Sequence, residues 1–289
     1  MQIIYDSYEK DNIYDGQSVL LEEKVAEYIK QEKNLSDILN EDYDSSIQNI
    51  FSKRAENVIN ALDIDSETHC LELLGRFGTF TRILSDKYKS ITTVETIKQR
   101  AEINYSRNID KTNIEIICTS DVLSLKYSRK FDTIFMINVL ENVNALLNDY
   151  TSSSDNLCVK LLERYKKLLN PGGKIIIVTN NKLSIKYLSG AKEYEKQNSY
   201  SPISSNQYMY GRYFSKNELN GIIEKSGFEK SKYYYVLPDI YCPSVVYSDE
   251  YLPSKDASKL NYNIYYNSFD TVVFSEIEAI KEITKARIF

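Results

Sequence analysis

The sequence has few of the residues that build metal centres and hydrolytic triads. It holds a single histidine, His69, among 289 residues, and its four cysteines are scattered without any Cys-x-x-Cys spacing. A zinc site needs several His or Cys ligands, and a Ser-His-Asp triad needs a histidine beside its nucleophile. We therefore expect no metal site and no triad hydrolase, and we interpret the cysteines as small apolar core residues.

Long apolar runs and basic clusters are also missing. The longest apolar runs, KIIIV and IFMINVL, are far shorter than the roughly 20 residues of a membrane-spanning helix. The N-terminus MQIIYDSYEKD lacks the basic and apolar regions of a signal peptide. The chain carries 41 acidic and 36 basic side chains, and no Lys/Arg cluster stands out that could neutralise a run of phosphates. We expect a cytoplasmic protein with no membrane span and no nucleic-acid partner.

Glycine is scarce, with 9 residues against 25 tyrosines. Places where glycines gather therefore need them for the backbone. One such place is CLELLGRFGTFTRIL, residues 70–84, which contains Gly75 and Gly78. The other is NPGGK, where Gly172 and Gly173 predict a tight turn into a strand.

The hydrophobic pattern divides the chain into two parts. Helical spacing over residues 17–32 and 46–62 predicts an N-terminal helical cap, residues 1–55, packed near the ligand-binding end. Short β-type runs then alternate with helical stretches, which predicts a parallel sheet with helices on both faces, within one domain of residues 56–289. The β-type runs are residues 68–74, 90–95, 114–120, 131–138 and 173–180.

The C-terminal part adds a helix, two strands and two long connections. Ser215 and Glu218 form a capping-box pattern, and EKSKYYYVLP and NSFDTVVFSE are β-type runs. We expect the second of these to be the last, antiparallel strand of a seven-stranded mixed sheet. The segments at about 182–213 and 238–263 are long connections of the kind that form substrate loops.

Polar residues follow four consecutive predicted strands. In a doubly wound sheet, ligands bind beyond the carboxyl ends of the strands, where the strand order reverses. Glu95 ends the second run about twenty residues past the glycine loop, where a carboxylate accepts both hydroxyls of a ribose. The polar groups are Glu72 with the loop of Gly75, Arg76 and Gly78, then Glu95, then Ser120 and Asp121, then Asn138.

Each of these groups also has an ordinary structural interpretation. A Gly-x-x-Gly pattern is common in tight strand-to-helix turns, and Glu95 is also explained as a solvated strand end. Asp121 is a suitable helix cap, and Asn138 is able to cap its own turn. Their order within one run of alternating strands and helices favours a shared ligand site.

This run resembles the class I S-adenosylmethionine-dependent methyltransferases. The resemblance rests on LELLGRFGTFT, TTVE, TSDVLSL, FDTIFMINVLENV and LLNPGGKIIIVT, and it covers about residues 55–275. It implies a doubly wound, Rossmann-like seven-stranded mixed sheet and S-adenosyl-L-methionine as cofactor. It assigns cofactor binding to Glu72, Gly75, Arg76, Gly78, Glu95, Thr96, Ser120, Asp121, Val122 and Asn138.

A narrower resemblance concerns the acceptor. TTVETIKQRAEINYSRN, NNKLSIKYLSGAKE, YFSKNELNGIIEKSGF and PDIYCPSVVYSDEYLP are similar to a bacterial branch associated with surface-polysaccharide biosynthesis. The long segments are rich in tyrosine, whose flat rings and hydroxyl tips suit a sugar, although packing also explains them. Candidate substrate residues are Asn181, Tyr187, Tyr210, Tyr213 and Tyr247. Candidate general bases are Glu141 and Asp239, with Asp249 and Glu250 as alternatives.

The glycine loop departs from the family pattern. In acid-x-Gly-x-Gly-x-Gly, Leu74 and Arg76 occupy two glycine positions, where a Cβ crowds the ligand or disfavours positive φ. We expect the turn to shift by one residue, so that Gly75 and Gly78 provide the room and Arg76 points outward or toward an anionic group.

Two functions follow. The first is methyl transfer to an oxygen or nitrogen of a small polar or carbohydrate-like acceptor, and the second is a degenerate binding or scaffold module. Retention of Glu95 and Asp121 favours the first. A dehydrogenase is less favoured because Gly-x-Gly-x-x-Gly is absent.

Overall fold

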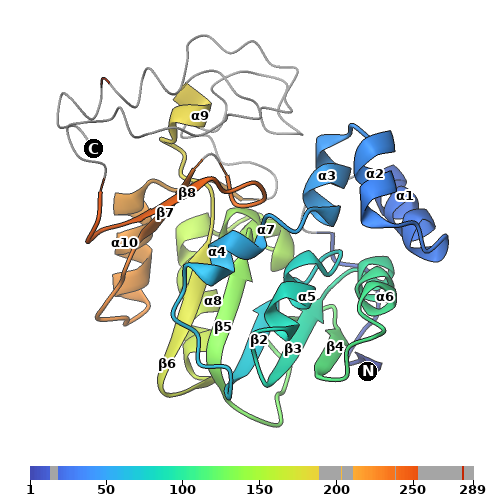
Figure 1. Cartoon of the computed structure of the whole chain (residues 1–289). Coiled ribbons are helices and arrows are strands. Elements are labelled where there is room, and N and C mark those ends of the chain that lie inside the picture. The colour runs from blue at the N-terminus through green and yellow to red at the C-terminus, as the bar shows by residue number, and fades with distance from the viewer. Residues whose placement is uncertain (14–18, 189–202, 204–210, 238, 253–281, 283–289) are drawn as a thin grey trace.

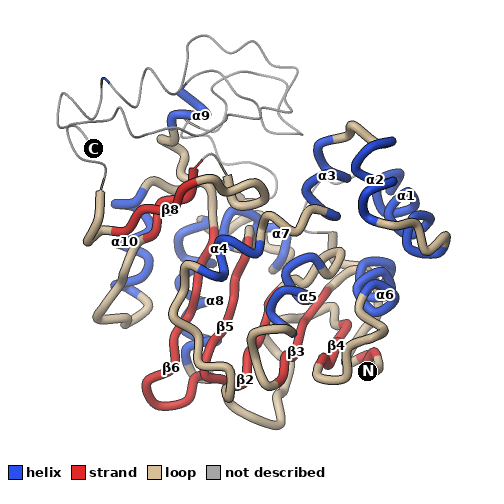
Figure 2. The backbone as a smooth tube through the Cα atoms, in the orientation of Figure 1, coloured by secondary structure: helices blue, strands red, loops and turns tan. Residues whose placement is uncertain are grey.

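The centre of the protein is a parallel sheet with helices on both faces (Figures 1 and 2). The computed structural model describes residues 1–13, 19–188, 203, 211–237, 239–252 and 282. Six strands pair in the order β1-β4-β3-β2-β5-β6, and the order reverses at β2, which lies between β3 and β5. The strands are β1 (Ile3–Tyr5), β2 (His69–Leu73), β3 (Ser90–Glu95), β4 (Ile114–Cys118), β5 (Phe131–Ile137) and β6 (Leu169–Val178).

Strand β5 shows why these strands have continuous apolar sequences. Ile134 and Met136 pack into the cluster that contains α8 (Ser154–Lys166), and Phe135 and Ile137 into the cluster on the opposite face. That face carries α5 (Thr79–Ser85) and, further along the sheet, α6 (Lys98–Arg107). A parallel strand buried on both faces therefore has apolar residues at most of its positions.

Four helices precede β2, and the described residues 1–13 before them are not helical. The helices are α1 (Val19–Lys30), α2 (Leu35–Glu41), α3 (Ser45–Phe51) and α4 (Glu56–Asn60). The expectation that residues 1–55 form helices alone is corrected at the start of the chain, where β1 pairs in parallel with β4. An added strand satisfies backbone groups that β4 would otherwise expose at the edge of the sheet.

Buried contacts attach the N-terminal helices to α6. Arg100 Nε of α6 lies 2.7 Å from a carboxylate oxygen of Glu22 in α1, and Arg100 is fully buried. Arg107 Nη2 donates to the carbonyl oxygen of Ile50 in α3 at 2.6 Å. Helices α1 and α3 are thereby held close to the loop between β2 and α5.

The rest of the described chain includes a second, two-stranded sheet. The expected strand at 229–238 is present as β7, but it pairs antiparallel with β8, inside a segment that we expected to be a loop. The expected strand at 267–276 lies outside the described residues. The elements are η1 (Leu140–Asn142), α7 (Val143–Leu146), α9 (Ile185–Leu188), α10 (Lys216–Lys225), β7 (Tyr234–Leu237) and β8 (Val245–Ser248). Among the described helices, none is long and apolar enough to cross a membrane.

The buried pair between α1 and α6 predicts a large effect of mutation. Arg100→Ala leaves the Glu22 carboxylate buried without this partner, so we expect the free energy of unfolding to fall by about 3–5 kcal/mol. The control is Lys98→Ala, because Lys98 pairs with Glu102 at 3.9 Å on the exposed side of the same helix. We expect a loss below about 0.5 kcal/mol there. Urea unfolding measures both, and equal losses would contradict a structural role for the buried pair.

Candidate functional site

The loop between β2 and α5 adopts positive φ at alternating residues. The φ angles are 65° at Leu74, 48° at Arg76 and 76° at Gly78. These are the three glycine positions of the expected pattern, so the expectation of a turn shifted by one residue was wrong. Positive φ costs a residue with a Cβ roughly 1–2 kcal/mol, so the loop holds this conformation against local preference at two positions.

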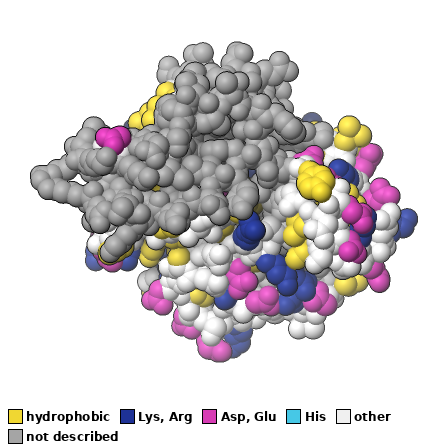
Figure 3. All heavy atoms as spheres, turned by 45° about the horizontal axis from the view of Figure 1, so that its top comes forward, with side chains coloured by type: hydrophobic (Ala, Val, Ile, Leu, Met, Phe, Trp, Pro, Cys, Tyr) yellow, Lys and Arg dark blue, Asp and Glu magenta, His cyan; other side chains and the backbone are white. Residues whose placement is uncertain are grey.

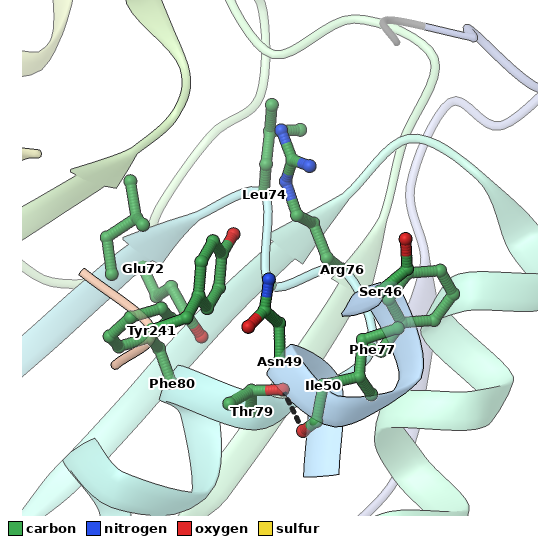
Figure 4. A pocket seen from close by; sticks show the side chains of 12 residues that line it. Ser46, Asn49, Ile50, Glu72, Leu74, Arg76, Phe77, Thr79, Phe80 and Tyr241 are labelled. Atoms are coloured by element: carbon green, nitrogen blue, oxygen red, sulfur yellow. Dashed lines mark hydrogen bonds between the residues drawn. The ribbon is translucent and has the colours of Figure 1, made fainter. Parts of the chain in front are cut away.

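Gly75 and Gly78 lie where the inner side of the loop meets other side chains. A Cβ on Gly75 would lie 2.1 Å from Thr93 Oγ1 and 2.6 Å from Asn104 Nδ2. A Cβ on Gly78 would lie 2.6 Å from both Asn104 Oδ1 and Asn108 Nδ2. Figure 4 shows the side chains of Leu74 and Arg76 extending together from the loop. The glycines are therefore needed at the buried contacts.

A small cavity opens beside this loop (Figure 4). Its volume is about 100 Å³. Helix α3, the loop, α5, the end of β5 and the chain between β7 and β8 all contribute to it. The lining residues are Ser46, Asn49, Ile50, Glu72, Leu74, Gly75, Arg76, Phe77, Thr79, Phe80, Ile137 and Tyr241.

Sequence reasoning missed most of the cavity lining outside the loop. Ser46 and Asn49 belong to the N-terminal helices, and the expectation that these helices pack near the ligand-binding end was the only signal for them. Tyr241 lies more than a hundred residues beyond β5 in the sequence, and it was one tyrosine among many. No local pattern distinguishes such a residue.

Glu72 is a buried acid at the bottom of this cavity. It is 2% exposed, and its Oε2 accepts a hydrogen bond from Thr81 Oγ1. Burial raises the pKa of Glu72 to about 7, and the nearby carboxylate of Glu95 adds to this, while the hydroxyls of Thr81 and Thr93 oppose it. A cation in the cavity would favour the ionised form of Glu72.

Arg76, Asn138 and Tyr241 converge at the side of the cavity. Arg76 Nη2 donates to the carbonyl oxygen of Asn138 at 3.1 Å. Asn138 has φ 52°, and its Nδ2 donates to the hydroxyl of Tyr241 at 3.0 Å. Burial raises the pKa of Tyr241, and Arg76 opposes this shift. The loop, the end of β5 and the chain before β8 thus join here.

Glu95 is fully buried at the end of β3. Its Oε2 accepts from the backbone N–H of Arg76 at 2.8 Å, and its Oε1 accepts from the N–H groups of Thr96 at 2.7 Å and Ile97 at 3.2 Å. Burial raises the pKa of Glu95, while Arg100 and these N–H groups oppose the shift. In this structure the carboxylate connects the loop to β3, so it is not a solvated strand end.

The N-terminal segment, residues 6–12, crosses the carboxyl ends of β3 and β4. Ser120 Oγ donates to the carbonyl oxygen of Lys10 at 2.8 Å, and Thr96 Oγ1 donates to that of Asn12 at 2.7 Å. Asn12 Nδ2 donates to the carbonyl oxygen of Leu146 at 2.6 Å. Two residues that sequence analysis assigned to cofactor binding, Thr96 and Ser120, are thus bonded to the chain itself.

Asp121 and Val122 complete this side of the site. Asp121 Oδ1 accepts from the N–H of Leu123 at 2.9 Å, so Asp121 caps a turn, whereas the sequence suggested a helix cap. Val122 is 1% exposed and packs in the same apolar cluster as Ile97 and Leu146. An adenine ring would therefore have to displace packed side chains here.

The two candidate bases have different surroundings. Glu141 is buried in η1, and its Oε2 accepts from Thr179 Oγ1 at 3.0 Å. Asp239 accepts from the N–H groups of Tyr241 and Cys242, which caps a turn. Asp239 therefore orders the backbone next to Tyr241.

The candidate substrate residues fall into two places. Asn181 is exposed and bridges to Phe214, while Tyr187 is fully buried and its ring lies 5.7 Å from that of Tyr213. Tyr247 lies on β8, where it stacks with Tyr251. Burial of Tyr187 fits the packing interpretation. Tyr210 lies outside the described residues.

Charged side chains of both signs are mixed on the visible surface. Figure 3 shows Lys and Arg interspersed with Asp and Glu over the part of this face that the structure describes. Neither sign of charge dominates the described part of this face.

Comparisons with known proteins identify the family of this chain. A family model described as a methyltransferase domain matches residues 43–232. A comparison with curated protein sequences finds no match.

Solved structures also match. The YcgJ protein from Bacillus subtilis is 11% identical, with 64% of this chain and 71% of that chain covered and a TM-score of 0.44. Phosphoethanolamine N-methyltransferase 1 from Haemonchus contortus, solved with phosphoethanolamine and S-adenosylhomocysteine, is 14% identical, with 69% and 39% covered and a TM-score of 0.44. A putative O-methyltransferase from Nostoc punctiforme is 14% identical, with 74% and 57% covered and a TM-score of 0.48. The chain therefore spans less than two thirds of the length of the latter two.

The loop geometry predicts unequal effects of adding a methyl group to two glycines. Gly78 and Gly172 both have positive φ, 76° and 79°, but a Cβ on Gly172 meets nothing within 4 Å. Gly172→Ala should cost about 1–2 kcal/mol through φ alone. Gly78→Ala also displaces Asn104 and Asn108, which should add about 1–3 kcal/mol. Equal losses in thermal or urea unfolding would contradict the tight packing behind the loop.

Proposed function

Since the chain belongs to the family of methyltransferase domains, whose model matches residues 43–232, we propose that it transfers a methyl group from S-adenosylmethionine to an oxygen or nitrogen atom. The sulfonium–carbon bond breaks, the bond from carbon to the acceptor atom forms, and the acceptor proton passes to a base or to water. Such a transfer depends chiefly on holding the two reactants in line. The observation that carries the proposal is the loop with positive φ at positions 74, 76 and 78, located where the strand order reverses.

The residues around the loop fit the amino-acid end of this cofactor. Arg76 is a donor for a carboxylate, and charge-assisted hydrogen bonds of this kind are among the strong ones. Glu72 lines the same cavity and is an acceptor for an ammonium group. Gly75 and Gly78 keep the backbone close to the polar side chains behind it. A zwitterionic group therefore finds both complementary charges within one cavity.

The nucleoside half requires the N-terminal segment to move. Thr96 and Ser120 bond to residues 6–12, so the ribose and adenine reach this side after those bonds break. We propose that Glu95 then accepts the ribose hydroxyls, and that Asp121 and Val122 border the adenine.

The acceptor is proposed from the residues beyond β5 and β6. A small polar or carbohydrate-like molecule, such as a glycan precursor of surface polysaccharides in the cytoplasm, suits the tyrosine-rich segments at about 182–213 and 238–263. Glu141 is the proposed general base and Tyr213 a proposed contact. Residues 1–55 act as the cap of this site, and residues 56–289 form the catalytic domain.

The second candidate function is a binding module that has lost the cofactor. The observation in its favour is the small volume of the cavity, about 100 Å³, together with the closed nucleoside side. Cofactor binding distinguishes the two functions.

Isothermal titration with S-adenosylhomocysteine tests the proposed function. We expect the wild type to bind it, and Arg76→Ala to weaken binding by at least about tenfold, because a charged hydrogen bond contributes about 1.5–3 kcal/mol. Alanine keeps the Cβ, so the φ preference at position 76 changes little. The control is Arg82→Ala, because Arg82 pairs with Asp110 at 2.8 Å on the surface. No binding to the wild type at millimolar ligand would favour the binding module.

The N-terminal segment predicts a kinetic effect. Asn12→Ala removes the bond to Leu146, which is worth about 1 kcal/mol, so ligand association should become about fivefold faster in stopped-flow measurements. Glu9→Ala is the control, because the Glu9 side chain is exposed and its backbone N–H keeps the bond to Ser120. If Asn12→Ala instead leaves association unchanged and speeds dissociation, the segment closes over the bound ligand and the proposed displacement is wrong.

A further inference from the structure

A buried chain of hydrogen bonds runs behind the loop and ends at Glu72. Its other members are not among the proposed binding contacts. Asn104 Nδ2 donates to Thr81 Oγ1 at 2.9 Å, and Thr81 Oγ1 donates to Glu72 Oε2. Asn108 Nδ2 donates to Asn104 Oδ1 at 2.8 Å. Thr81, Asn104 and Asn108 are all fully buried.

The directions of these bonds follow from the groups present. The hydroxyl proton of Thr81 serves Glu72, so its lone pair is left for the amide of Asn104. The Nδ2 group of Asn104 therefore faces Thr81, and its Oδ1 faces Asn108. Each member fixes the orientation of the next.

We propose that Thr81 and Asn104 are positioning residues that hold the Glu72 carboxylate toward the cavity, where it receives a primary ammonium group of an amino-acid-like ligand. The inference rests on the proposed function, since that ammonium belongs to the cofactor. Apolar side chains could fill the same buried space, and buried polar groups are costly unless they are paired. Packing alone therefore does not explain why these buried positions carry hydrogen-bonded polar side chains.

Asn104 also contacts the loop at both glycines. Its side-chain atoms lie 2.6 Å from the positions that a Cβ of Gly75 or Gly78 would take. One side chain of α6 thus supports the strained loop from behind and, through Thr81, orients the acid beside it. This arrangement couples the position of Glu72 to the shape of the loop.

The charges around Glu72 decide how it responds to pH. Glu95 on β3 raises the pKa of Glu72, as burial does, and the hydroxyls of Thr81 and Thr93 lower it. Cys70 on the same strand is a buried thiol with its pKa raised well above the usual value, so it stays neutral. Arg76 lines the same cavity and is the cation on the loop, and Asn49 and Tyr241 add neutral polar groups from α3 and the chain before β8.

The sign of the pH effect follows. An ammonium ligand binds the ionised form of Glu72, so affinity in the wild type should rise with pH through about 7, the raised pKa of this group. Without the Thr81 hydroxyl, the pKa of Glu72 is higher still. The rise in affinity then occurs at higher pH, and binding near neutral pH is weakened.

The test compares Thr81→Val with Thr81→Ser. Isothermal titration from about pH 6 to about pH 9 measures two ligands: S-adenosylhomocysteine, which carries the ammonium group, and 5′-methylthioadenosine, which lacks it. At neutral pH, a rise of one unit from a pKa of about 7 lowers the ionised fraction of Glu72 about fivefold, so Thr81→Val should bind the first ligand about fivefold more weakly. The loss should disappear at the alkaline end. Binding of 5′-methylthioadenosine should be unchanged, and Thr81→Ser should restore the wild-type profile.

Other outcomes overturn the inference. If Thr81 had only a structural role, Thr81→Val would weaken the binding of both ligands by the same factor at every pH. If Thr81 had no role, the affinity for neither ligand would change. If Thr81→Val does not fold, Thr81→Ala, which adds no methyl group in place of the hydroxyl, provides the same comparison. Wild type that binds neither ligand would overturn the proposed function and this inference with it. Wild type that binds both, with an unchanged Thr81→Val profile, would overturn the inference alone.

Discussion

Positive φ at positions 74, 76 and 78 requires support from every side of the loop, because two of these residues carry a Cβ that disfavours it. The carbonyl oxygen of Val94 accepts from the N–H of Leu74 at 2.8 Å, and Glu95 accepts from the N–H of Arg76. Asn104 packs against the opposite side of the loop. A fully buried carboxylate at the end of β3 is therefore explained by the loop it holds.

The same requirement extends to the N-terminal helices. The guanidinium of Arg100 lies 5.4 Å from the ring centre of Phe77 in the loop and also pairs with Glu22 of α1. Thr79, at the start of α5, donates to the carbonyl oxygen of Ile50 in α3. The loop is thus held between β3, α6 and α3. The N-terminal segment and the chain that carries Tyr241 form hydrogen bonds on the remaining sides of the site.

The alternation of strands and helices could be predicted because each strand is buried on both faces and each helix on one. The expected runs from 68–74 to 173–180 are confirmed as strands of a parallel sheet. The short strands β1 and β8 were missed, since three or four residues carry too little periodicity to stand out. The expected shift of the glycine turn was also wrong. This expectation assumed that residues with a side chain avoid positive φ. In the structure, the surrounding hydrogen bonds offset the free-energy cost of positive φ.

The sequence by itself determined the parallel α/β architecture, the position of the loop and the acids that follow the strands, because these depend on local pattern and on order along the chain. Only the tertiary structure decided what those acids do. Glu95 accepts hydrogen bonds from backbone N–H groups, and Asp121 caps a turn. The hydroxyls of Thr96 and Ser120 donate to carbonyl oxygens of residues 6–12. The bond at Asp121 is local, but those of Thr96 and Ser120 depend on which distant part of the chain reaches a strand end. Hydrogen bonds between residues that lie 84 and 110 positions apart leave no periodic signal in the sequence.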